Sequence, residues 1–159
     1  MMVLGLSSCT QPKSTLNYDQ VLMLDAEALA ESGVKEAYLR ILPQLADYVH
    51  HPLEIEEIYD DLNGLYAVRV GQTTIEIYGP QYKADIYDGW GRATYALFKI
   101  VNDQLSGSTY KFYALNDDND LSGIFLREDQ VEAEKKIIKN PIYWPYIPTD
   151  EAPWFGKFH

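Results

Sequence analysis

The segment LYAVRVGQTTIEIY, residues 65–78, decides the fold class of this chain. Its apolar and polar side chains alternate on both sides of Gly71 and Gln72, which is the pattern of two half-buried strands joined by a two-residue turn. Upstream, an apolar stretch that begins at Ile55 runs into the turn sequence DDLNG, residues 60–64. The sequence therefore predicts a β-hairpin near the middle of the chain.

Two helices are predicted before this hairpin. Residues 17–20 have the form of a capping box, and apolar residues at helical spacing continue from there towards Gly33, a typical C-cap. A second apolar stripe covers residues 34–49 and ends before Pro52, because the residue before a proline is disfavoured in a helix. We expect Pro43 to kink this second helix, because its ring clashes with the preceding turn and it lacks an amide donor.

After the hairpin, residues 90–105 predict the central helix, because their apolar side chains fall on one face and Gly107 closes the pattern. Strands are predicted at residues 110–115 and 123–126, joined by the acidic turn NDDND. The last helix is expected to begin near Asp129 and to stop before the next Asn-Pro pair.

Strands flanked by helices, without a regular βαβ alternation, predict the α+β class. We expect a mainly antiparallel sheet of about five short strands packed against helices, with the central helix on the sheet. Residues 141–159 are rich in aromatic residues and prolines, and are expected to cross the domain as an extended strap. The alternative is an exposed aromatic platform, built on Trp144 and Trp154, for a sugar or a protein partner.

The net charge of the chain limits the classes of molecule that it is expected to bind. The 159 residues carry a formal net charge of −11, which disfavours nucleic acid and anionic lipid surfaces, because both attract Lys and Arg. The hydrophobic content of 47% indicates a packed core, and residues 17–159 suit a single globular domain. An acidic surface favours a basic protein partner, although the same charge can serve solubility alone.

Residues 1–9 end in Leu6-Ser7-Ser8-Cys9, which contains the only cysteine of the chain. This segment resembles the lipobox of bacterial lipoprotein precursors, in which small residues precede a cysteine that is lipidated and becomes the mature N-terminus. The resemblance implies a partial signal at residues 1–9, a tether at residues 10–16 and a lipid anchor at Cys9, on the periplasmic side of the bacterial envelope. The segment departs from the family pattern because no Lys or Arg precedes Cys9. The alternative is a cytoplasmic protein whose lipobox-like segment is accidental.

A second resemblance concerns metal binding. The stretch from Asp118 to Asp129 resembles an EF-hand calcium loop, with oxygen ligands from Asp118, Asp120 and Ser122, a sharp turn at Gly123, and Asp129 at the twelfth position. It departs from the family because a strand, rather than a helix, is predicted before it. The alternative is an acidic hairpin turn, which Asn and Asp favour. We expect no cofactor, with Ca²⁺ at this loop as the alternative.

Other candidate sites are few. His50 and His51 beside Glu54 fall short of the three or four ligands that zinc takes, so no metal ligand is assigned. No Gly-x-Ser-x-Gly elbow or Walker motif is present, and no catalytic residue is assigned. Acids in turns are typical of a solvated surface that can meet a partner. The candidate partner-binding residues are Glu56, Glu57, Asp60, Asp61, Asp117, Asp118, Asp120, Trp144 and Trp154.

Three functions follow from these observations. The preferred hypothesis is a non-enzymatic, acidic protein-binding module. Immunity proteins that neutralise basic secreted toxins are similar to this chain in size and charge, with no shared motif. The second hypothesis is a surface lipoprotein that binds carbohydrate or cell-wall material through its C-terminal aromatic residues. The third is a hydrolase with unrecognised carboxylates, which would need a deep pocket holding a buried acid.

Overall fold

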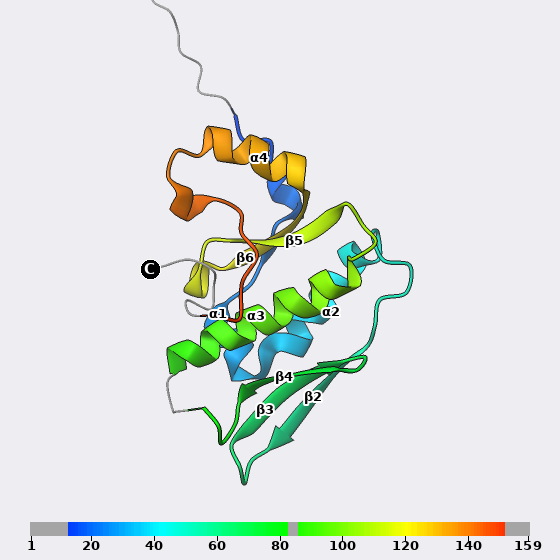
Figure 1. The fold of residues 1–159 in the computed structure, drawn as a ribbon, viewed down its shortest axis with the longest axis vertical. Helices are drawn as coiled ribbons and strands as arrows, with labels where there is room; N and C mark the ends of the chain where they lie inside the picture. The colour runs from blue at the N-terminus through cyan, green and yellow to red at the C-terminus, as the bar shows by residue number, and fades with distance from the viewer. Residues whose placement is uncertain (1–12, 83–85, 152–159) are drawn as a thin grey trace, which may run out of the picture.

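Two three-stranded antiparallel sheets form the β-structure of the computed structural model, which describes residues 13–82 and 86–151 (Figure 1). The strands of the first sheet, in order β1-β6-β5, are β1 (Leu22–Met23), β6 (Ser122–Arg127) and β5 (Tyr110–Leu115). The strands of the second sheet, in order β2-β3-β4, are β2 (Ile55–Asp60), β3 (Leu65–Val70) and β4 (Thr73–Tyr78). The predicted α+β class and antiparallel pairing are confirmed, while the strands divide between two sheets.

Four α-helices surround and separate these sheets within the described chain. They are α1 (Ala26–Ala28), α2 (Val34–Leu45), α3 (Ile86–Gln104) and α4 (Glu128–Ile137). Other helical turns are η1 (Tyr18–Gln20), η2 (Leu29–Gly33), η3 (Asp118–Asp120) and η4 (Pro141–Tyr143). None of the helices that the structure describes is long and apolar enough to cross a membrane.

The central hairpin forms where the sequence predicts it. Val70 pairs with Thr73 across the two-residue turn, and Gly71 adopts a φ of +57°, which glycine reaches without steric cost. Helices α2 and α3 contact this sheet through β2 and β4, respectively.

Helix α3 joins the two sheets into one core (Figure 1). It contacts β4 on one side and β5 on the other. Its Phe98 stacks on Phe112 of β5, with ring centroids 4.7 Å apart. Near its start, Gly89 lies so close to Tyr78 that a Cβ would fall 2.3 Å from the phenol oxygen. The missing side chain therefore lets α3 approach the second sheet.

The prediction of one long helix from residue 17 to Gly33 is wrong. A single turn, η1, precedes strand β1, and the helix begins only after Asp25, whose carboxylate accepts a hydrogen bond from the amide of Ala28 at 3.0 Å. Pairing of Met23 with Ser122 explains the difference, because a strand partner far along the chain can override local helical spacing. Helix α2 also ends earlier than predicted, two residues after Pro43.

The predicted strap is confirmed over its described part. Tyr146 exchanges two backbone hydrogen bonds with Ala114, of 2.7 and 3.1 Å, so the strap extends the free edge of β5. The indole N–H of Trp144 donates to the carbonyl of Ile138 at 2.8 Å. Trp154 lies outside the described residues.

The segment before the predicted domain start is also fastened. The fully buried carboxylate of Glu134 on α4 accepts hydrogen bonds from the Ser14 hydroxyl, the Thr15 amide and the Thr15 hydroxyl, at 2.6 to 3.0 Å. Leu16 is buried beside it, in a cluster with residues of β5, β6 and α4. Ordered packing therefore begins within residues 10–16, the predicted tether.

Candidate functional site

A hollow of about 370 Å³ forms where the β5–β6 turn meets the strap. We call it the acid-rimmed hollow. Its lining residues are Met23, Asn116, Asp117, Asp120, Ile142 and Tyr143. Two separate sequence features, the acidic turn and the aromatic tail, thus contribute to one surface.

The acidic turn reaches this position through the pairing of β5 with β6. Leu115 opposes Ser122, and the turn between them includes η3. Asn116 and Asp118 have φ values of 58° and 47°, in the left-handed region that Asn and Asp tolerate better than most residues. The amide of Asp120 donates to the carbonyl of Asp117 at 3.0 Å, which closes the turn.

The strap holds the opposite wall of the hollow. The Asn140 side chain accepts a hydrogen bond from the amide of Ile142 at 3.2 Å, which fixes the start of η4. Beyond η4, the Tyr146 hydroxyl donates to the carbonyl of Asn116 at 2.8 Å and ties the strap to the acidic turn. The two walls of the hollow are therefore joined by a direct hydrogen bond.

Apolar side chains are exposed in this hollow. Met23 is 63% exposed, Tyr143 60% and Ile142 38%. They come from β1 and η4, which are distant in sequence but meet beside the acidic turn. Exposed apolar groups gathered beside polar ones are typical of an interaction site, whereas single exposed apolar residues are common on any surface.

Acidic and basic groups both lie near the hollow, and Arg40 donates a hydrogen bond to the carbonyl of Met23 at 3.2 Å. Burial raises the pKa of the Tyr146 phenol, and the nearby carboxylates of Asp117 and Asp118 raise it further, because they oppose a new negative charge. None of the six described residues that line the hollow is Lys or Arg. The site is therefore suited to a positively charged group with an apolar portion.

The other predicted acids lie in the second sheet: Glu56 and Glu57 are in the first half of β2, and Asp60 and Asp61 are at the β2–β3 turn. Glu56 forms an ion pair with Arg69 on the neighbouring strand. Glu57 accepts hydrogen bonds from the Tyr66 hydroxyl at 3.0 Å and the Lys35 amide at 3.3 Å. The structure therefore does not bring all the predicted partner-binding acids onto one surface.

The tip of that hairpin is a defined turn. Asp60 accepts hydrogen bonds from the amides of Leu62 and Asn63 and from the Asn63 side chain. These bonds, the Asn63 side chain first, hold the pKa of the Asp60 carboxyl below its ordinary value. Leu62 is 98% exposed at the tip, and Asp61 beside it is exposed.

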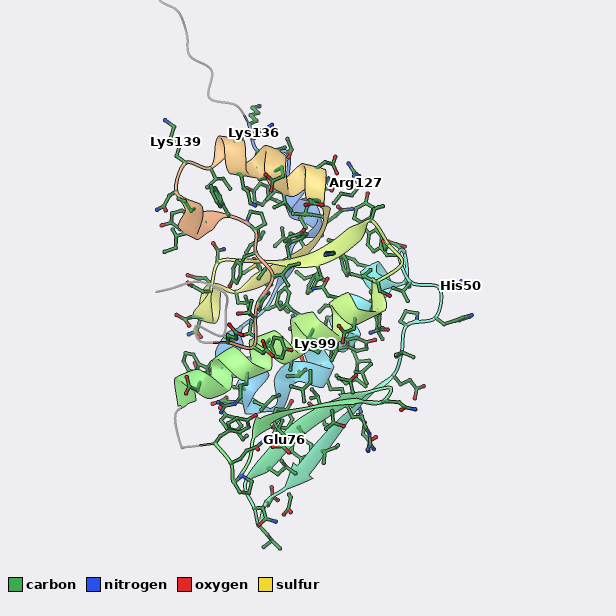
Figure 2. All side chains as sticks on the ribbon, viewed as in Figure 1. His50, Glu76, Lys99, Arg127, Lys136 and Lys139 are labelled. Carbon is green, nitrogen blue, oxygen red and sulfur yellow. The ribbon has the colours of Figure 1, made fainter. Side chains whose placement is uncertain are left out.

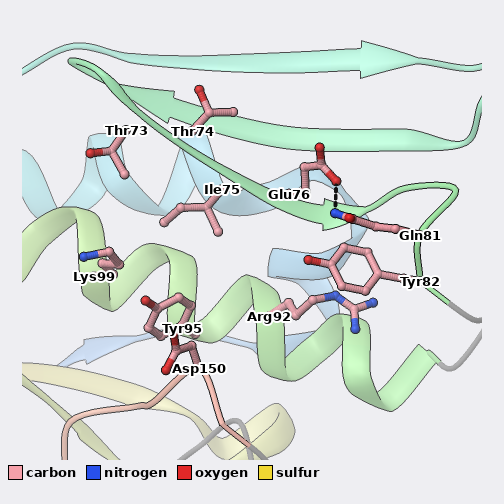
Figure 3. Close-up of a pocket in the computed structure, with 10 residues that line it drawn as sticks. All are labelled: Thr73, Thr74, Ile75, Glu76, Gln81, Tyr82, Arg92, Tyr95, Lys99 and Asp150. Atoms are coloured by element: carbon pink, nitrogen blue, oxygen red, sulfur yellow. Dashed lines mark hydrogen bonds between the residues drawn. The ribbon is translucent and has the colours of Figure 1, made fainter.

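A larger hollow, of about 500 Å³, lies between strand β4, helix α3 and the strap (Figure 3). Its lining residues are Thr73, Thr74, Ile75, Glu76, Gln81, Tyr82, Arg92, Tyr95, Lys99 and Asp150. Several of its polar groups are engaged within the chain: Gln81 donates to Glu76, and Lys99 pairs with Asp103 at 2.9 Å. Both signs of charge are mixed in this hollow, so it selects neither a cation nor an anion.

Arg92 in this larger hollow has structural contacts. Its side chain is almost fully buried, and its Nε donates to the carbonyl of Ile77 at 2.6 Å. Its guanidinium carbon lies 3.9 Å from the centroid of the Tyr82 ring. These contacts fasten the segment after β4 to α3.

The stretch from Asp118 to Asp129 differs in its geometry from an EF-hand calcium loop. Ser122 is buried, with its hydroxyl 3.4 Å from the Leu115 carbonyl, and Gly123 lies in strand β6 against the ring of Phe112. Asp129 pairs with Arg127 at 2.9 Å. Strand pairing draws the centre of the stretch into the sheet. The described residues contain no group of three or more His, Cys, Asp or Glu that could hold a metal ion.

The two histidines and Trp144 do not line the acid-rimmed hollow. His50 and His51 lie in the loop after α2 rather than at its end, with ring centroids 4.2 Å apart, and Figure 2 shows His50 pointing outward from this loop. Trp144 is half-buried beneath Lys135, whose Nζ lies 5.5 Å from the ring centroid. Cys9, the predicted lipidation site, lies outside the described residues.

Sequence reasoning missed part of the acid-rimmed hollow. From the sequence, the helical spacing of apolar residues predicts that Met23 lies in a helix. The sequence predicts only that Asn116 lies in a turn. Ile142 and Tyr143 belong to the predicted aromatic tail, so composition indicated the segment but not its position beside the acidic turn. No local sequence pattern predicts that β1 and η4 lie side by side at the acid-rimmed hollow.

Comparison of the chain with protein-family models, with curated proteins and with solved structures finds no match to any of them.

Proposed function

We propose that this protein is a non-enzymatic binding module for a basic protein partner, and that the acid-rimmed hollow is the centre of its interface. A toxin or enzyme that is secreted and neutralised by the module would be such a partner. The proposed setting is the periplasmic side of a bacterial envelope, with Cys9 as the lipid anchor.

One observation carries this proposal: exposed apolar side chains and carboxylates occupy the same hollow. Interfaces combine a buried apolar centre, often with Tyr or Met, with a polar rim. Met23 and Tyr143 supply the apolar part, and Asp117 and Asp120 supply the rim. The carboxylates alone would serve solubility, whereas the exposed side chains of Met23 and Tyr143 add nothing to it.

The net charge of −11 supports a basic partner. Complementary charge speeds the encounter of two proteins and suppresses wrong partners, and its effect falls as salt rises. Three bases lie along α4: Arg127 is its N-cap, Lys136 lies in its last turn, and Lys139 follows it (Figure 2). The described lining of the acid-rimmed hollow combines three exposed apolar side chains with two carboxylates and contains no Lys or Arg.

The proposal is tested by affinity capture with two variants of equal net charge. Immobilised chain is exposed to envelope and secreted fractions of its host, at low salt and at high salt. The first variant is Asp117→Lys with Asp120→Lys, in the hollow. The matched control is Glu36→Lys with Asp47→Lys, two exposed sites on and after α2.

We expect one stoichiometric partner that the wild type and the control retain, that the hollow variant loses, and that high salt releases. Equal loss with both variants would show that net charge alone drives binding. Capture of no protein would overturn the proposal and direct the work to carbohydrate and cell-wall ligands.

A further inference from the structure

We propose that the outer edge of β4 binds an extended segment of the basic partner, which adds a fourth strand to the second sheet. The inference rests on the proposed function for the identity of the partner, and it adds a second surface to the interface. The site is the larger hollow, of about 500 Å³, which lies beside β4 and α3 (Figure 3). Peptides that add a strand to an exposed sheet edge are held mainly by backbone hydrogen bonds.

The outer edge of β4 is open. The strand order β2-β3-β4 leaves one side of β4 without a neighbouring strand. In an antiparallel pair, every second residue turns its backbone N–H and C=O away from the partner strand. Counted from Val70 and Thr73, which close the two-residue turn, these residues of β4 are Thr74 and Glu76. Within the part of the chain that the structure describes, no residue outside the sheet bonds these backbone groups, so they are available to an added strand.

The edge of β5, in contrast, is closed by the chain itself. The side chain of Asn102 accepts a hydrogen bond from the amide of Phe112 at 2.8 Å and donates one to its carbonyl at 2.9 Å. The next outward-facing residue, Ala114, exchanges backbone hydrogen bonds with Tyr146 of the strap. An uncovered edge is a template for pairing with another chain. The open stretch of β4 is therefore suited to a partner, whereas the edge of β5 is not.

The side chains beside the open edge favour a short strand. Ile75 of β4 and Tyr95 of α3 are both partly exposed and provide an apolar contact (Figure 3). At one end, Nε of Arg92 donates to the carbonyl of Ile77 at 2.6 Å, so the open edge stops before that residue. Residues 73–76 span about 13 Å, at roughly 3.3 Å per residue, which is the length of a four-residue strand.

Charge favours a basic protein over a second copy of this chain. Pairing of two β4 edges would bring together two chains that each carry −11, and like charges oppose association. A segment with Lys or Arg meets the opposite charge. Because Lys99 in the lining is paired with Asp103 and both signs are mixed there, this preference acts over the whole molecule and weakens as salt rises.

The test is an NMR titration of the full chain with synthetic peptides at low salt. The probe is acetyl-KTVTVTK-amide, an alternating sequence of residues that favour strands. The matched acidic peptide is acetyl-ETVTVTE-amide, which keeps the pattern and reverses the charge. A third peptide is the basic probe N-methylated at its five central residues, which keeps the side chains and removes the backbone donors.

We expect the basic peptide to give saturable shifts of the Thr74 and Glu76 amides, with a dissociation constant on the order of 0.1–1 mM. The acidic peptide should bind at least about fivefold more weakly, because its charge has the same sign as that of the chain. The N-methylated peptide should not bind, because an added strand needs its amide donors.

One pair of variants tests the edge itself. Thr74→Pro removes an outward N–H, and proline is tolerated on an edge strand where that N–H faces solvent. This variant should bind the basic peptide about fivefold more weakly, through the loss of one hydrogen bond. Thr74→Ala loses the same hydroxyl but keeps the N–H, and should bind like the wild type. Chemical-shift dispersion shows that each variant is folded, and the N-methylated peptide decides the matter if Thr74→Pro is not.

Four outcomes would overturn the inference: no binding of the basic peptide, equal binding of the acidic or the N-methylated peptide, shifts along β2 instead of β4, or shifts of the β4 amides when the protein alone is concentrated. The last outcome would show that a second copy fills the edge. Peptide binding at β4 without a captured protein supports the edge site and overturns the proposed function. A protein captured through Asp117 and Asp120, with no peptide binding at β4, leaves the module and overturns the edge site.

Discussion

Glu134 shows how one side chain fixes the beginning of the domain. It is the fully buried acid among the described residues, and its two oxygens accept three hydrogen bonds from Ser14 and Thr15. The third hypothesis from sequence, a hydrolase, needed a buried acid in a deep pocket. The Glu134 carboxylate instead holds the N-terminal segment against α4, which is a structural role.

Replacement of this carboxylate should destabilise the protein. Glu134→Ala leaves the donors of Ser14 and Thr15 without their acceptor and should lower the free energy of unfolding by about 2 kcal/mol. The measurement is urea denaturation. The control is Glu132→Ala on the same helix, which removes an exposed pair with Lys135 and should cost less than about 1 kcal/mol. Equal losses for both variants would contradict the structural role of Glu134.

Asp60 provides a pH-dependent test of the hairpin tip. Its bonds, above all to the Asn63 side chain, lower its pKa below the ordinary value of 3.8 in the folded state. A lowered pKa gives stability that is present above the unfolded value and is lost as the pH falls through the folded value. An NMR titration of the Leu62 and Asn63 amides should therefore have a midpoint below pH 3.8. Asn63→Ala should move this midpoint upward, and an unchanged midpoint would refute the Asn63 hydrogen bond as the cause.

At the scale of elements, side-chain periodicity predicted the type and position of each segment whose pattern fits only one kind of secondary structure. The hairpin of β3 and β4, helix α3 and the β5–β6 pair lie within a few residues of their predicted bounds. The failures have one physical cause. Strand β1 and the calcium-like stretch both depend on pairing with distant segments, and local spacing does not report such pairing.

Gly123 tests the corrected interpretation of that stretch. In an EF-hand the glycine provides a sharp turn, but in this chain it lies in β6, where a Cβ would fall 2.2 Å from Cζ of Phe112. Gly123→Ala should therefore lower the free energy of unfolding by about 1–3 kcal/mol. Gly107→Ala is the control, because a Cβ there meets no atom within 4 Å and should change stability by less than about 0.5 kcal/mol. A similar small effect at both glycines in thermal or urea denaturation would sink the packing argument.

At the scale of the whole molecule, the first described residues lie against α4, where Ser14 and Thr15 bond Glu134. The β2–β3 tip lies at the opposite end (Figure 1). The acid-rimmed hollow is lined by residues of β1, the β5–β6 turn and η4, which belong to the first sheet and the strap.

The anchor itself is testable. Expressed in its own host, the chain should incorporate labelled fatty acid and sediment with membranes, because a lipidated cysteine inserts its acyl chains into the bilayer. Cys9→Ala should lose the label and move to the soluble fraction. Its unfolding curve should match that of the wild type. Absence of label from the wild-type chain would refute lipidation at Cys9.

Local sequence patterns were enough to predict the α+β class, the central hairpin, helix α3 and the presence of an acidic turn and an aromatic strap. These features depend on side-chain periodicity and turn chemistry, which act over a few residues. Only the tertiary structure decided that the strands divide between two sheets, that Ser122 and Gly123 belong to a strand, and that Met23, Asp117 and Tyr143 share one hollow. Those arrangements depend on contacts between segments far apart in the chain. Such contacts stabilise the fold only once the segments have come together, so no short stretch of sequence predicts them.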